Sequence, residues 1–283
     1  MTLFQAASSA YEQRLRRAEY LAGEHAFAAE VLKFFSEITK FQKSLYARVA
    51  AAASAAAAHG GGASPPIRAA FDAALVLPHF RAFLSTVERY APVPLAESAR
   101  QMAARPPEEW VAQFAEYWSG SANVQTASGD GETEAVAQFF PRAFLQPYAE
   151  FLAEQIPTPT LLETAKLCPL CGGQPFLGVL RREGDGGKRF LVCNFCAQEW
   201  EFRRLLCPTC GEDHERKLPI YVAEQFPHVR VEACETCKSY LPAIDLTKDG
   251  NAIPLVDDLA AMPLTLWAQE HGFVRRHANL LGT

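Results

Sequence analysis

Apolar residues in the first part of the chain recur at the spacing of helices. The clearest run lies between residues 31 and 49, where apolar positions three, four and seven apart predict an amphipathic helix with one buried face. Prolines at 141 and 147 are expected to kink or divide a later helix. The same pattern predicts further helices over residues 69–77, 80–90, 108–118 and 133–155.

The pattern changes after a proline-rich stretch, Ile156-Pro157-Thr158-Pro159. Beyond it, short β-branched and aromatic runs separated by turn residues predict strands, and apolar residues between 256 and 270 return to helical spacing. The fold class is therefore α+β, with an N-terminal all-α helical domain, tandem β-ribbon modules and a C-terminal helix. The predicted strands are residues 176–180, 189–192, 220–222, 229–231 and 240–246.

A length of 283 residues leaves room for about two or three domains. We expect a helical domain followed by two small modules and a C-terminal helix and tail. The predicted boundaries are 1–160, 161–203, 204–250 and 251–283.

All eight cysteines of the chain fall in four CxxC pairs. Thiolates that converge from two such pairs make a tetrahedral sulfur site for zinc or iron, so the count predicts two metal ions, each on four cysteines. A ribbon module of roughly 40 residues buries too little apolar surface to fold alone, so bound metal would supply much of its stability. The predicted ligands are Cys168, Cys171, Cys193, Cys196, Cys207, Cys210, Cys234 and Cys237.

The cysteine segment reads as one unit written twice. The first and third pairs share a Cys-Pro-x-Cys-Gly sequence, at Cys168 and Cys207, and 25 and 27 positions separate these residues from Cys193 and Cys234. Proline fixes φ and glycine permits positive φ, so the backbone can curl round a metal. The repeat favours one site from the first two pairs and one from the last two. An interleaved arrangement, first pair with third and second with fourth, is the alternative.

Three other roles for the cysteines compete with a metal-organised binding function. Structural disulfides need an oxidising compartment, and the chain begins MTLFQAASSAYEQRLRR, without an export signal. A redox-active CxxC needs a pair at a helix N-terminus in a βαβ setting. The third role is purely structural zinc. No apolar run approaches the roughly 20 residues that span a bilayer, so we expect a soluble, cytoplasmic protein without membrane insertion.

Charge argues against nucleic acid. Lysine and arginine total 27 against 32 acidic residues, and residues 160–240 hold eleven of each sign. Local patches at Arg181/Arg182, Lys188/Arg189 and Arg203/Arg204 keep a nucleic-acid-binding ribbon protein as an alternative.

No catalytic motif is present, and we expect no enzyme and no catalytic residue. The seven histidines are scattered without metalloprotease spacing, and hydrolase and dinucleotide signatures are absent. His214 follows Cys210 closely but is not needed as a ligand. Asp257 and Asp258 are interpreted as a helix start rather than a catalytic dyad.

The ordered motifs resemble those of the FdhE-type formate dehydrogenase accessory proteins, and the resemblance spans most of the chain. Weaker matches lie near Arg14, Gln146 and Glu270. The residues that carry it are Leu167–Pro175, Phe190–Trp200, Arg204–Cys210, Val231–Leu241 and Asp257–Ala260.

This resemblance implies two rubredoxin-like modules after a helical domain, each holding a metal on four cysteines, with iron reported for the family. It also implies a cytoplasmic, chaperone-like factor for the maturation of formate dehydrogenase. The implied partner is the catalytic subunit, with its molybdenum cofactor, before its export by the twin-arginine route. The family's oligomeric state does not follow from these motifs.

The function expected from both lines of reasoning is binding rather than turnover. Metals would organise the ribbons so that exposed side chains between the cysteine turns, such as Arg203, Arg204, Tyr221 and Phe226, meet the partner. A redox-active iron protein is the alternative, because iron on four thiolates changes oxidation state and zinc does not.

Overall fold

The computed structural model of the chain describes residues 3–57, 67–120, 131–156, 163–183 and 186–282. Leaving aside the last two residues, the chain forms two compact units, each assembled from two stretches of sequence. Residues 1–15 and 34–157 form the helical unit, and residues 16–33 and 158–281 form the sheet unit.

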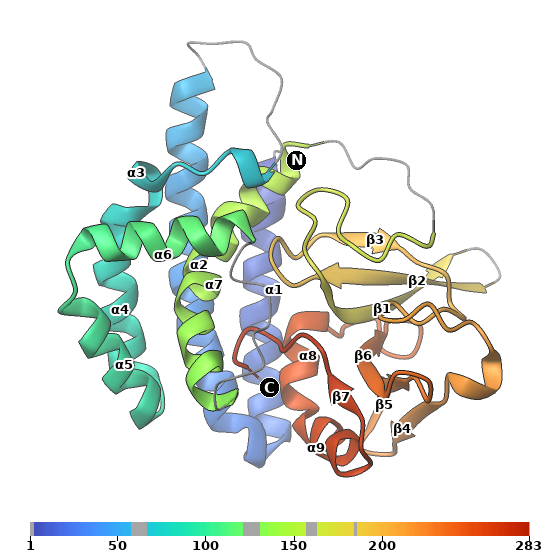
Figure 1. Cartoon of the computed structure of the whole chain (residues 1–283). Coiled ribbons are helices and arrows are strands. Elements are labelled where there is room, and N and C mark those ends of the chain that lie inside the picture. Colours follow the sequence, from blue (N-terminus) through green and yellow to red (C-terminus); the bar gives the residue numbers. More distant parts are fainter. Residues whose placement is uncertain (1–2, 58–66, 121–130, 157–162, 184–185, 283) are drawn as a thin grey trace. The chain divides into compact units, whose positions relative to one another are not determined.

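The helical unit contains parts of two long helices, α1 (Leu3–Glu24) and α2 (Ala29–Ala57), which also contribute to the sheet unit. Shorter helices follow along the chain, and a long helix, α7, ends the unit (Figure 1). They are η2 (Ile67–Ala69), α3 (Ala73–Val76), η3 (Leu77–His79), α4 (Phe80–Tyr90), α5 (Val93–Ala103), α6 (Pro107–Ser119) and α7 (Gly131–Glu154).

The helix predicted over 80–90 is observed as α4, and that over 108–118 as α6. The helix predicted over 69–77 is largely wrong, because only Ala73–Val76 is α-helical and 3₁₀ turns lie on both sides. Helices α1 and α5 were not predicted. α5 begins beside Pro92 and Pro94 and buries mainly alanines, which give a weak apolar pattern.

Aromatic side chains fill the core of the helical unit. Phe80 of α4 is fully buried. Its ring meets Phe114 of α6 edge to face at 4.7 Å between centroids, and Phe144 of α7 at 4.9 Å. Such contacts add to the free energy gained by burying each ring, so this cluster fixes how α4, α6 and α7 pack.

Helix α7 continues through Pro141 and Pro147 as a single element, so the two prolines do not divide it. Pro147 has no N–H for the carbonyl four residues earlier, which belongs to Ala143. The side-chain amide of Gln42 on α2 donates to that oxygen at 2.8 Å, and Gln42 is buried. A side chain therefore replaces the helix hydrogen bond that proline removes.

We expect Gln42→Leu to lower the free energy of unfolding by about 1–3 kcal/mol, because it leaves the buried carbonyl of Ala143 without this donor. Pro147→Ala restores a backbone N–H that can bond the same oxygen, so the cost of Gln42→Leu should fall in that background. Urea unfolding of both single variants and the double variant measures this coupling. Equal costs in the two backgrounds would show that Gln42 acts through packing alone.

The sheet unit is built on one seven-stranded sheet in the order β3-β2-β1-β6-β5-β4, with β7 paired to β6. All five predicted strands are observed: four lie within longer or equal strands, and the one predicted over 240–246 extends one residue past the end of β6. The strands are β1 (Pro175–Glu183), β2 (Gly186–Cys193), β3 (Glu199–Glu201), β4 (Ile220–Ala223), β5 (Phe226–Ala233), β6 (Ser239–Asp245) and β7 (Val274–Arg275).

The internal repeat is visible in the order of the strands. Each half has a cysteine pair, two antiparallel strands, a second cysteine pair and a third strand. The halves join where β1 and β6 pair in parallel, with Gly178 opposite Ala243. A side chain at Gly178 would lie 3.0 Å from the Cβ of Ala243, which explains glycine there. The two predicted ribbons are thus parts of one continuous sheet.

Two short helices, α8 (Pro254–Ala260) and α9 (Met262–Glu270), replace the single helix predicted over 256–270. They pack against β1, β5 and β6 and close an apolar core that includes Val179, Val231 and Leu264. The α+β fold class is confirmed. The predicted boundary at 160 falls outside the described residues, and the divisions at 203 and 250 stay predictions. In the described part of the chain, every helix is too short or too polar to cross a bilayer.

Candidate metal centres

The first two cysteine pairs come together in one cluster. Cys168 and Cys171 precede β1, Cys193 ends β2, and Cys196 lies in the turn before β3. The sulfur of Cys168 is 3.6 Å from that of Cys196, and the sulfur of Cys171 is 3.4 Å from that of Cys193. All four side chains are buried, so the cluster is closed to solvent.

The last two pairs form a second cluster by the same plan. Cys207 and Cys210 precede β4, Cys234 follows β5, and Cys237 lies in the turn before β6. Sulfur separations are 3.8 Å for Cys207 and Cys237 and 3.6 Å for Cys210 and Cys234. The structure therefore groups the cysteines in sequential pairs, and the interleaved arrangement is not observed.

These separations suit a shared ion. With metal–sulfur bonds of about 2.3 Å, the corners of a tetrahedron lie about 3.8 Å apart. The four ligand atoms of each cluster lie within 4.8 Å of one another. A disulfide bond is about 2.05 Å long, and all eight thiols are free. Each cluster could thus bind one metal ion, and the disulfide alternative is wrong.

The first cysteine of each pair sits in the same backbone turn. Cys168 N donates to the carbonyl of Gly173 and Gly172 N to the carbonyl of Cys168, both at 2.8 Å. Equivalent bonds join Cys207 to Glu212, at 2.8 Å, and Gly211 to Cys207, at 3.0 Å. Gly172 and Gly211 have positive φ, as the Cys-Pro-x-Cys-Gly sequence predicts.

The second and fourth pairs adopt this turn without glycine. Ala197 and Lys238 occupy the equivalent position with φ of 55° and 53°. Residues other than glycine are strained there, so both turns must be held by the surrounding structure. Amide groups also point at sulfur, with Gly173 N 3.3 Å from Cys171 Sγ and Phe195 N 3.4 Å from Cys193 Sγ.

The thiols of the first cluster do not ionise independently. Hydrogen bonds from the other three cysteines lower the pKa of Cys168, while the same kind of contact raises the pKa of Cys196. Burial raises the pKa of Cys193. Without a cation, the cluster therefore shares protons among its sulfurs, because four buried thiolates repel one another. A bound divalent ion would release those protons and neutralise the charge.

A serine hydroxyl distinguishes the second cluster. Ser239 Oγ lies 2.9 Å from Cys237 Sγ and 3.2 Å from Thr209 Oγ1. Burial raises the pKa of Cys237, but hydrogen bonds from Ser239, Cys210 and Cys234 together lower it by more, to about 7. Burial raises the pKa of Cys234 to about 12. Contact of Ser239 with this cluster was not predicted from the cysteine spacing.

A buried arginine links the two cysteine modules. Arg189 on β2 forms an ion pair with Glu232 on β5, at 2.6 Å between nitrogen and oxygen. Its guanidinium also donates to the carbonyls of Arg203 and Leu206, at 3.2 and 3.1 Å. Leu206 directly precedes Cys207, so Arg189 of the first half positions the start of the second cluster.

Carboxylates pair with several residues of the basic patches that had kept nucleic acid as an alternative. Arg181 forms two 2.8 Å hydrogen bonds with Glu199, and Lys188 lies 3.1 Å from Glu201. Arg189 is buried. Phe226 is buried as well, against the ring of His25, so its predicted exposure to a partner is wrong.

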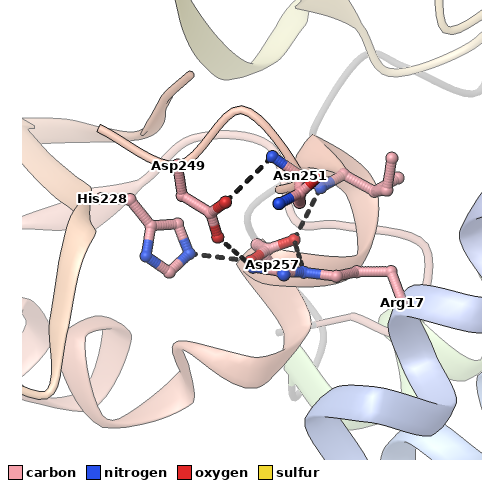
Figure 2. Close-up of polar contacts among 6 residues, drawn as sticks. Arg17, His228, Asp249, Asn251 and Asp257 are labelled. Atoms are coloured by element: carbon pink, nitrogen blue, oxygen red, sulfur yellow. Dashed lines mark hydrogen bonds and ion pairs between the residues drawn. The ribbon is translucent and has the colours of Figure 1, made fainter. Parts of the chain in front are cut away.

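His214 is not a ligand of the second cluster, since its Nδ1 accepts a bond from Arg216 N. A third polar group instead gathers His228, Asp249 and Asp257 (Figure 2). Arg17 of α1 lies between the two carboxylates, with its NH2 nitrogen 2.7 Å from Asp249 and its Nε 3.0 Å from Asp257. This group therefore already contains a cation, and a metal ion would have to displace it.

Asp257 and Asp258 are both buried in α8, and each pairs with a different arginine. Asp257 accepts from His228, from Arg17 and from the backbone N–H of Ile253, the residue just before the helix. Asp258 accepts from Arg275 at 2.8 Å. The interpretation as a helix start is correct for Asp257, but burial and ion pairing were not expected. Sequence spacing alone cannot pair residues 240 positions apart.

We expect Arg17→Met to lower the free energy of unfolding of the sheet unit by about 3–5 kcal/mol, because it leaves the buried Asp257 without its arginine. Arg16→Met, a change at an exposed neighbour, should cost less than about 0.5 kcal/mol. Adding Asp257→Asn to Arg17→Met should recover part of the loss. Urea unfolding followed by circular dichroism compares these variants with Asp257→Asn alone, and additive costs at 17 and 257 would argue against this pairing.

The comparisons with known proteins agree with this geometry. A model of the FdhE central domain matches residues 167–204, and a model of the FdhE C-terminal domain matches residues 206–281. Residues 167–281 therefore match the FdhE family. The "Protein FdhE homolog" of Aquifex aeolicus (strain VF5) is 32% identical over 154 residues, 54% of each chain. That of Pseudomonas aeruginosa is 38% identical over 124 residues, 42% of this chain and 40% of the relative.

The match thus spans about half the length of the curated FdhE relatives. A solved structure extends the likeness in fold. The crystal structure of the FdhE protein from Pseudomonas aeruginosa has a TM-score of 0.69, with 22% identity over 97% of this chain and 96% of that chain. At this identity the comparison shows a shared fold, including the helical part that the family models leave unmatched.

Proposed function

We propose that this FdhE-type chain binds two metal ions, iron or zinc, one on each four-cysteine cluster. All eight cysteines act as ligands in this proposal, through the sequential pairs. The observation that carries it is the close approach of four sulfurs in each cluster, at 3.4 to 3.8 Å for the nearest pairs. Bound metal would cross-link the strands of each half, and iron would in addition be able to change oxidation state.

We further propose that the metal-loaded protein is a cytoplasmic, non-enzymatic accessory factor. Its partner would be the catalytic subunit of a formate dehydrogenase, held during maturation of that enzyme. Support comes from the family match and from the resemblance of the cysteine motifs. The exposed Arg203 and Arg204, with the outward-facing Ile220 and Val222 of β4, offer polar and apolar surface for a partner.

Metal content of double variants tests the ligand assignment. The intact chain should carry two ions. Cys168→Ser with Cys193→Ser changes two residues of one cluster and should leave one ion, whereas Cys193→Ser with Cys234→Ser changes both clusters and should leave none. Elemental analysis of the purified proteins measures this. The opposite result, none from the first pair and one from the second, would support interleaved sites.

Association with the partner is tested by co-purification from cytoplasm that contains the formate dehydrogenase catalytic subunit. We expect the intact chain to retain the subunit and the variant Cys193→Ser with Cys234→Ser to lose it, because the unmetallated sheet unit loses its shape. Glu97→Ser, at an exposed position of α5, serves as the control and should bind as the intact chain does. A metal-free variant that still binds the subunit normally would contradict the link between metal and partner.

A further inference from the structure

The two cysteine clusters differ in their access to solvent. In the first, the residue exposures are 3%, 7%, 1% and 1% for Cys168, Cys171, Cys193 and Cys196. In the second, Cys207 and Cys234 are equally buried, but Cys237 is half-buried and Cys210 is exposed. The duplicated unit has therefore produced one closed cluster and one cluster with an open side.

Solvent access decides how easily a four-coordinate ion changes ligands. A new ligand first approaches the ion, which expands its coordination, and one of the old ligands then leaves. In the first cluster all four cysteines are buried, which keeps an incoming ligand away from the ion. In the second, the exposed Cys210 gives an incoming group a path to the ion and is the thiolate best placed to leave.

A lysine side chain lies near Cys210 and can attract an anionic ligand. Lys166, an exposed residue, extends its ammonium group over this turn and donates to the carbonyl of Thr209 at 3.4 Å. The same nitrogen would lie 3.1 Å from a side chain at Gly211, the residue after Cys210. Lys166 therefore places a positive charge near Thr209 and Gly211, the residues on either side of Cys210. Such a charge attracts anions, and thiolates are the anions that soft thiolate-bound ions prefer.

We propose that the second cluster is an exchange centre, where an external thiolate replaces Cys210 on the bound ion, while the first cluster stays closed. This inference rests on the proposed metal binding. In the step, a bond forms between the ion and the incoming sulfur as the bond to Cys210 Sγ breaks. The released Cys210 thiolate would take up, through water, the proton that the incoming thiol gave up on becoming a thiolate, and the ion would keep its oxidation state. The thiolate can belong to a small thiol or to a cysteine of a partner protein.

Release kinetics from the fully zinc-loaded chain test the proposal. The first measurement is the zinc content: fewer than two ions per chain would contradict the proposed function itself. With two ions present, 4-(2-pyridylazo)resorcinol should take up one ion at least tenfold faster than the other. Cys234→Ser should remove only the fast phase, and Cys193→Ser only the slow phase. Release of both ions at one rate, or faster loss from the first cluster, would overturn the proposal.

Thiol dependence tests the chemistry of the incoming group. Glutathione should accelerate the fast phase in proportion to its concentration, whereas S-methylglutathione should not. A decapeptide with one cysteine, compared with its serine analogue, tests a protein source in the same way. N-ethylmaleimide added during the fast phase should label Cys210 before any other cysteine, as read by mass spectrometry. Labelling that begins at Cys168 or Cys193, or acceleration by neither thiol, would contradict exchange at Cys210.

Lys166→Ala tests the role of charge. It should reduce the acceleration by glutathione at least threefold while leaving the zinc content at two. Lys248→Ala is the matched control, because Lys248 is an exposed lysine that also donates to a backbone carbonyl, that of Pro227. Equal effects of the two changes would show that Lys166 has no special part in attracting the thiolate.

Discussion

Repulsion among clustered thiolates is the constraint on which the sheet unit depends. Each cluster brings four sulfurs within 4.8 Å of one another at the junctions of strands. The protein alone resolves this by keeping protons on some of the sulfurs, as the opposite pKa shifts of Cys168 and Cys196 indicate. A divalent ion resolves it better, because it turns four mutually repelling groups into four bonds. The turns that hold the sulfurs connect neighbouring strands, so a bound ion would also fix the register in which those strands pair.

The same constraint explains how much the sequence could predict. Cysteine spacing and the Pro and Gly residues of two turns were sufficient to group all eight thiols correctly, since these features act within a few residues. The positive φ of Ala197 and Lys238 was not predicted, because alanine and lysine seldom adopt it. Their conformation is imposed by the cluster. Contacts between residues far apart in the sequence could not be predicted either. Neither the parallel pairing of β1 with β6 nor the hydrogen bond from Gln42 to Ala143 is indicated by the neighbouring residue types.

Prediction of the helices failed where the apolar pattern was diluted. Helix α5 buries Ala96, Ala99 and Met102, so the run of large hydrophobic residues that marks a buried face is missing. Conversely, Pro141 and Pro147 were expected to kink or divide α7. The helix continues through both, and at Pro147 a neighbouring side chain supplies the missing donor. In both cases tertiary packing overrides local preference.

Duplication followed by divergence of surroundings accounts for the different character of the two clusters. Their backbone turns match nearly bond for bond, so the difference does not come from the turns themselves. The difference comes from the residues around the turns. In the first half, Trp200 and Phe195 are buried, and the indole N–H of Trp200 donates to the carbonyl of Ala165. In the second half, Cys210 is exposed, Ser239 contacts Cys237, and Lys166 donates to the carbonyl of Thr209. Arg189 ties the start of the second cluster to the first half of the sheet. A closed cluster can thus stabilise the sheet while the open cluster remains accessible to external ligands. Two identical clusters could not divide these roles.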